Sequence, residues 1–153
     1  MQRKTSRRNL WIALSLLLIG QTSDPGYAQK NVQRNVTPAG VWDLRGVDEV
    51  DGEETTFLAT LVLRKSKQGG FEGHCDWLGS SGSCGREHVR CQFDAGTREI
   101  KLVGTKLEQV TGGLALGNYR ARVSEDGQRL EEGAWSGEIA VPGEWSAKRI
   151  RVR

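Results

Sequence analysis

The sequence predicts an all-β domain folded as an antiparallel up-and-down barrel of about eight strands. From Gly40 onward apolar residues recur at every second position, which is the period of a β-strand. Short glycine-centred breaks separate these runs, and no comparable stretch repeats at helical spacing. Short connections permit only antiparallel neighbours. A barrel is favoured over the alternative, a β-sandwich, because closure removes the exposed strand edges.

The N-terminal segment 1–28 predicts a cleavable signal peptide. Its first ten residues contain four basic side chains and no acid, and a predominantly apolar run follows over 10–19. That run is shorter than the roughly 20 residues a membrane span needs, so no stable span is expected after cleavage at Ala28. We therefore expect export to the periplasm or the exterior. The pair Arg7 and Arg8 leaves twin-arginine export open beside general secretion.

The basic charge of the chain belongs to this segment. The whole chain has 22 basic and 19 acidic residues, and removal of residues 1–28 takes away four basic residues and Asp24, which leaves 18 of each. A neutral mature chain argues against nucleic-acid binding. The remainder of the 153 residues fits one domain, with 29–39 as a disordered linker and 40–153 as the barrel.

Eight strands follow from the runs between the breaks. We expect them near 40–50, 55–66, 70–78, 85–94, 98–109, 114–124, 129–139 and 143–152. An eight-stranded barrel has an interior that side chains fill or that holds one small ligand. The inward positions include Leu63 and Leu102, and the candidate ligand-binding residues are Phe57, Leu61, Phe71, Trp77, Phe93, Tyr119 and Trp135.

The two ends of the domain carry a motif pair. The first strand contains Gly40-Val41-Trp42, and the last contains Trp145 followed by Lys148 and Arg149. This arrangement resembles the calycin group of barrels, the lipocalins and their relatives. The resemblance implies that Trp42 packs at one end of the barrel under a cation from Lys148 or Arg149, a contact worth up to about 2 kcal/mol. Alternatively, Trp42 only fills the core.

All three cysteines and both histidines lie within 74–91. No Cys-x-x-Cys or His-x-x-x-His pair is present, so neither a metal site nor another cofactor is expected. In an oxidising compartment a disulfide accounts better for the cysteines. Cys75 with Cys91 is the favoured pair, across a hairpin turning at 80–83. Cys84 is then the odd thiol, or it pairs with either of the other two.

Three functions follow from these features, in this order. The first is a non-catalytic exported barrel, without catalytic residues, that binds a small apolar ligand inside or a protein partner through its loops. The second is a secreted inhibitor or protein-interaction module that uses the 79–85 loop. The third is a hydrolase in which Cys84 or Ser81 acts with His88 and Asp76.

Overall fold

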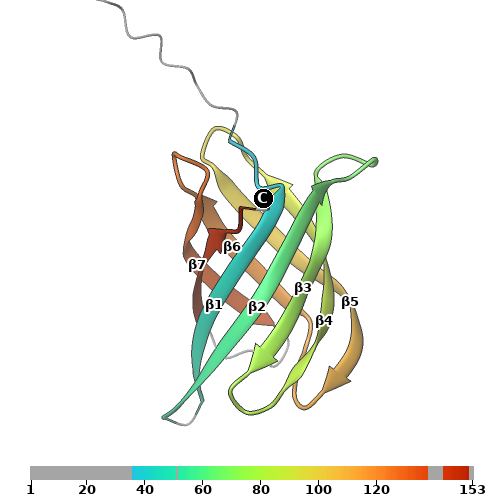
Figure 1. Cartoon of the computed structure of the whole chain (residues 1–153), viewed down its shortest axis with the longest axis vertical. Helices are drawn as coiled ribbons and strands as arrows, with labels where there is room; N and C mark the ends of the chain where they lie inside the picture. The colour runs from blue at the N-terminus through green and yellow to red at the C-terminus, as the bar shows by residue number, and fades with distance from the viewer. Residues whose placement is uncertain (1–35, 51, 138–142, 152–153) are drawn as a thin grey trace, which may run out of the picture. The chain divides into compact units, whose positions relative to one another are not determined.

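Eight antiparallel strands form a closed barrel in the order of the sequence (Figure 1). The structure is a computed structural model and describes residues 36–50, 52–137 and 143–151. This confirms the predicted all-β barrel, and the sandwich alternative is wrong. The strands are β1 (Gly40–Val50), β2 (Glu53–Lys65), β3 (Phe71–Gly79), β4 (Cys84–Phe93), β5 (Glu99–Thr111), β6 (Gly117–Val123), β7 (Arg129–Gly137) and β8 (Gly143–Arg149).

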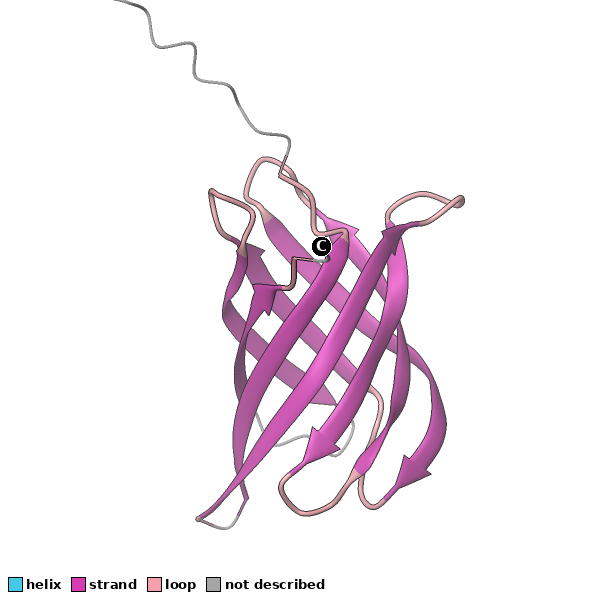
Figure 2. Ribbon diagram, in the orientation of Figure 1, coloured by secondary structure: helices cyan, strands magenta, loops and turns pink. Residues whose placement is uncertain are grey.

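Strands and loops account for all of the described ranges (Figure 2). In them no helix is long and apolar enough to cross a membrane. The predicted signal peptide and most of the predicted linker lie outside the described residues. The strand expected from residue 114 begins only at Gly117, and β5 continues to Thr111.

Pairing of the first strand with the last closes the barrel. On β1, Trp42 lies opposite Leu61 of β2 on one side and opposite Arg149 of β8 on the other. Every strand is therefore hydrogen-bonded to two neighbours. The alternation of apolar and polar residues follows this closed sheet, with one face turned into the barrel and the other toward solvent.

The interior differs in chemistry between its two ends. At the end where β1 begins, which we call the Trp42 end, the core consists of Trp42 and mainly aliphatic side chains. At the opposite end, which we call the aromatic end, the rings of Phe57, Trp77, Tyr119, Trp135 and Trp145 gather, with neighbouring ring centroids 5.7 to 6.5 Å apart.

Glycines make room for these rings. A Cβ atom on Gly143 would lie 2.1 Å from the Trp135 ring, and one on Gly46 would lie 2.3 Å from it. A Cβ on Gly133 would likewise meet the ring of Trp145. The sequence pairs glycine with tryptophan on β7 and β8 because each large ring covers a glycine on a neighbouring strand.

A β-bulge interrupts the pairing of β7. Three residues of β8, from Trp145 to Ala147, lie opposite four residues of β7, from Leu130 to Gly133. Within the bulge Glu132 adopts a φ of 56°, in the left-handed region. The extra residue shifts the alternation of inward and outward side chains by one position after Glu131 and Glu132. Trp135 therefore points into the barrel.

Candidate functional site

Arg149 closes the Trp42 end. Its guanidinium carbon lies 4.1 Å from the centre of the Trp42 ring. It donates hydrogen bonds to the backbone oxygens of Ala39 (2.5 Å), Thr37 (2.7 Å) and Gly127 (2.7 Å). Of the two cations left open by the sequence, Arg149 therefore covers the tryptophan. Lys148 is exposed on the outer face, because neighbours on a strand point to opposite sides.

A buried carboxyl group, that of Glu87, lies inside the aromatic end. The side chain is 0 % exposed. It accepts hydrogen bonds from the Tyr119 hydroxyl (2.6 Å) and the Trp77 indole nitrogen (3.1 Å), both at Oε2. Its other oxygen, Oε1, accepts one from the backbone N–H of Gly117 (2.8 Å). One carboxyl group thus links β3, β4 and β6 in the barrel interior.

Burial raises the pKa of Glu87, and the hydrogen bonds from Tyr119, Gly117 and Trp77 oppose that shift. None of the ion pairs found in the described ranges involves Glu87. The charged form of this group is therefore stabilised by neutral donors alone.

A second carboxyl group, that of Asp48, occupies an inward position at the same end. It continues the inward series of Trp42, Leu44 and Gly46 along β1, without a bulge. Its Oδ1 atom is buried and has no hydrogen-bond partner within the described part of the chain. Burial raises the pKa of Asp48 as well. Two inward positions toward this end of the barrel therefore carry acidic groups, Glu87 and Asp48.

The segment between β5 and β6 packs against the aromatic end. Its Leu114 side chain is half-buried, packs against the core and lies 3.1 Å from where a Cβ of Gly85 would stand. The segment is tied to the turn after β3 by a hydrogen bond from Gly113 N to Ser83 Oγ (3.3 Å). It ends at Gly117, whose N–H binds Glu87. We call residues 112–116 the strap.

The predicted ligand-binding residues separate into three groups. Phe57, Trp77, Tyr119 and Trp135 meet at the aromatic end, and Leu61 lies fully buried beside Trp42. Phe71 and Phe93 instead form a pair of their own at the Trp42 end, with centroids 6.3 Å apart. Four of the seven residues thus share one site.

The predicted disulfide is wrong. Cys75, Cys84 and Cys91 are all free. Across the hairpin Cys75 lies opposite Glu87, Cys91 lies opposite Phe71, and Cys84 lies opposite Leu78. Four residues along β4 separate the partner of Cys75 from Cys91. That is a distance of about 13 Å, well beyond the roughly 7 Å limit between the Cα atoms of bridged cysteines.

A thiol titration of the purified mature protein checks this. With a chromogenic disulfide reagent in denaturant and without reductant, we expect three thiols per chain. Burial raises the pKa of the Cys75 thiol well above its usual value and that of Cys91 to about 12. In the folded protein Cys84 should therefore react first. A count of one thiol would contradict the register of the β3–β4 hairpin.

The hydrolase constellation is not assembled. Cys84 and His88 lie four residues apart on β4, about 13 Å along the strand. Asp76 forms a two-pronged ion pair with Arg86 (2.6 and 2.9 Å). Ser81 lies in an exposed turn. Among residues 36–50, 52–137 and 143–151, no three His, Cys, Asp or Glu side chains are placed to hold one metal ion.

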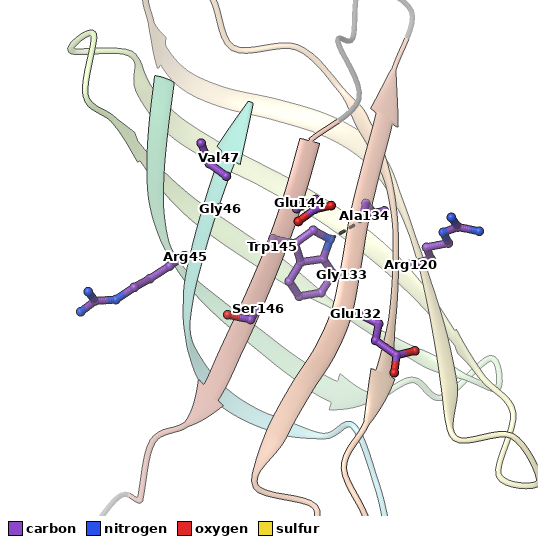
Figure 3. A pocket seen from close by; sticks show the side chains of 10 residues that line it. All are labelled: Arg45, Gly46, Val47, Arg120, Glu132, Gly133, Ala134, Glu144, Trp145 and Ser146. Carbon is purple, nitrogen blue, oxygen red and sulfur yellow. Dashed lines mark hydrogen bonds between the residues drawn. The ribbon is translucent and has the colours of Figure 1, made fainter. Parts of the chain in front are cut away.

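An open groove of about 690 Å³ lies along the barrel wall beside the β7 bulge (Figure 3). The Trp145 indole forms part of its lining and donates a hydrogen bond to the Ala134 carbonyl oxygen (3.1 Å). Two arginines, Arg45 and Arg120, and two glutamates, Glu132 and Glu144, also line it. A groove that is open to solvent and lined by both signs of charge does not favour one kind of ligand. The aromatic end instead combines acidic groups with aromatic rings.

Sequence reasoning missed both acidic residues. The sequence pattern could have indicated both of them. Glu87 precedes Val89 and Cys91 in the series of inward positions along β4. Asp48 likewise continues the series of Trp42 and Leu44 forward. A polar residue in an apolar series is a better indicator of a site than the apolar residues around it.

Comparison with protein families, curated proteins and solved structures finds no match to this chain.

The raised pKa of Glu87 leads to a prediction about stability and pH. The folded state binds a proton more tightly at Glu87 than the unfolded state, in which the pKa is about 4.3. Its contribution to stability is complete below about pH 4.3 and is lost as pH rises through the folded pKa. Urea unfolding of wild type and Glu87→Gln at several pH values checks this. We expect the wild type to lose stability relative to the variant as pH rises, and a constant difference would contradict it.

Proposed function

We propose that this protein is an exported, calycin-like barrel that binds a small ligand with an aromatic or apolar group at its aromatic end. The observation that carries the proposal is the cluster of Phe57, Trp77, Tyr119 and Trp135 around buried Glu87. Ligand sites are mainly apolar with a few placed polar groups, and the mouths of barrels are common locations for them.

Kinship with the calycins is supported by the closure of the opposite end. The eight-stranded meander and the Arg149 cation over Trp42 both agree with the resemblance seen in the sequence. With one end closed by this contact, a ligand would enter from the other. Export remains an expectation that rests on residues 1–28.

The strap supports the proposal as well. Leu114 contributes one aliphatic side chain over Gly85. Within the described part of the chain, the strap is joined to the neighbouring turn by one side-chain hydrogen bond, from Gly113 N to Ser83 Oγ. Displacement of one such side chain costs less than opening a strand pair, because no ladder hydrogen bonds break. A ligand with one ring would take the place of Leu114.

The alternative, partner binding through the 79–85 loop, has weaker support. That loop consists of glycine, serine and one cysteine. Interface hot spots are enriched in tryptophan, tyrosine and arginine, which the loop lacks.

Calorimetric titration with a neutral aromatic probe, 2-phenylethanol, tests the proposal. We expect saturable binding that Trp135→Leu weakens by up to about tenfold, because an aromatic contact is worth about 0.5–1.5 kcal/mol. Phe93→Leu is the matched control, since Phe93 belongs to the aromatic pair at the Trp42 end. Equal loss in both variants, or no binding by wild type, would count against the aromatic end as the site.

A further inference from the structure

Two histidines face each other on the outer surface of the barrel. His74 of β3 and His88 of β4 are direct partners across the hairpin, and their ring centroids lie 6.5 Å apart. Both side chains are partly exposed, because they alternate with the inward side chains of Cys75 and Glu87. Side chains directly opposite each other on one face of a sheet are close enough to act on one ligand. Neither imidazole is needed to fill the core.

The nitrogen Nε2 of His88 lies beside a carboxylate without a hydrogen bond to it. Its distance to Oε2 of Glu108 is 3.1 Å, yet this buried nitrogen has no hydrogen-bond partner among the described residues. The oxygen is thus near the nitrogen but out of line with it. A histidine nitrogen and a carboxylate oxygen that bind the same zinc ion lie about 3.0–3.5 Å apart, with the ion in line with the ring nitrogen. The two side chains therefore have the spacing of two ligands of one metal ion.

His74 supplies a third ligand after a small movement. As they stand, no three such side chains in the described ranges surround one point. Two imidazoles on one tetrahedral ion have their ring centres roughly 5 to 5.5 Å apart. The 6.5 Å between the rings of His74 and His88 therefore has to shorten by about 1 Å. Rotation of a partly exposed side chain provides a movement of this size.

The charged neighbours are compatible with a cation at this point. Asp76 accepts two hydrogen bonds from Arg86 (2.6 and 2.9 Å), so these two charges cancel. Lys106 lies 2.5 Å from Glu108, but its side chain is 65 % exposed, and an exposed ion pair is worth at most about 1 kcal/mol. The Lys106 ammonium can therefore move into solvent at little cost and leave the Glu108 carboxylate to the metal ion.

We propose that His74, His88 and Glu108 bind a divalent transition-metal ion of the zinc type, with water in the remaining position. Imidazole nitrogens select Zn²⁺ over Mg²⁺ and Ca²⁺, which prefer oxygen ligands. The three ligands lie on β3, β4 and β5, so the ion joins three adjacent strands. The sequence predicted no metal site, because strand pairing, and not close spacing along the chain, brings these ligands together.

Calorimetric titration of the tag-free mature protein with ZnCl₂ at pH 7.5 tests the site. A Cys84→Ser background removes the one thiol that is not buried, since thiols also bind zinc. We expect one ion per chain, and a loss of affinity of at least about tenfold in both His74→Gln and His88→Gln. MgCl₂ should give no binding. Absence of saturable zinc binding, or unchanged affinity in either histidine variant, would overturn the inference.

A carboxylate variant and a stability measurement complete the test. Glu108→Gln should weaken zinc binding, whereas Glu99→Gln should not, although both side chains lie on β5 and are similarly exposed, at 39 and 41 %. Saturating ZnCl₂ should raise the urea midpoint of the Cys84→Ser protein and leave that of its His88→Gln variant unchanged, because the ion binds only the folded site. Equal zinc affinity of Glu108→Gln and Glu99→Gln, or an equal rise of the midpoint in both proteins, would contradict the three-ligand site.

Discussion

Trp42→Ala is expected to destabilise the barrel by about 3–5 kcal/mol, the usual cost of removing a buried tryptophan. Trp42 is 0 % exposed, and its indole nitrogen donates to the Pro38 carbonyl oxygen (3.0 Å). Loss of the ring also leaves the Arg149 guanidinium without its aromatic partner. Urea unfolding followed by far-UV circular dichroism measures the effect.

Trp42→Phe and Arg149→Met separate packing from the cation contact. Trp42→Phe keeps a ring and should cost less than Trp42→Ala. A double-mutant cycle between Trp42→Phe and Arg149→Met should show coupling, because the two side chains touch. Independent, additive losses would indicate that Trp42 only fills the core.

Gly46→Ala is expected to destabilise the barrel by about 1–3 kcal/mol through overpacking. Its Cβ would lie 2.3 and 2.4 Å from two atoms of the Trp135 ring and 3.2 Å from the backbone oxygen of Glu144. With backbone on one side and a packed ring on the other, Trp135 must leave its position. A red shift of tryptophan emission, together with a lower urea midpoint, would report this.

Gly113→Ala is the control, because no atom lies within 4 Å of the position its Cβ would take. It should leave both emission and stability nearly unchanged. The double variant of Gly46→Ala with Trp135→Leu should recover part of the loss, since the smaller side chain removes the clash. Full additivity would show that the ring does not occupy the space over Gly46.

Much of the fold could be predicted because the period of two is strong along nearly every strand. Short connections then restricted the topology to a meander, and the need to cover edges favoured closure. The position of Trp42 under a cation was also predictable from the motif pair. The choice of Arg149 over Lys148 follows from strand alternation once Ala147 is known to point inward.

The register of the β3–β4 hairpin could not be predicted in the same way. Any shift by an even number of residues keeps the same side chains inward, so alternation alone does not distinguish Cys75 opposite Cys91 from Cys75 opposite Glu87. The turn decides it, through the hydrogen bond from Gly79 N to Ser83 O (2.7 Å). This local geometry shifted the pairing by four residues and replaced a disulfide with a buried acid.

The candidate site was predicted only in part, for a related reason. Apolar residues occupy inward positions at both ends of the barrel, so the prediction from apolar residues alone included rings from both ends. Phe71 and Phe93 lie far from the acids, while Glu87 and Asp48 were excluded by their polarity. A polar side chain at an inward position becomes informative only when the strand that carries it is already fixed.

Joining β1 to β8 has a consequence for how the chain matures. The first strand needs a partner that is made about a hundred residues later, so its outer edge stays unpaired throughout synthesis. Contacts between such distant segments form late and slowly. The barrel cannot close before its last strand is complete, so the pairing of Arg149 with Trp42 belongs to the last stage of folding.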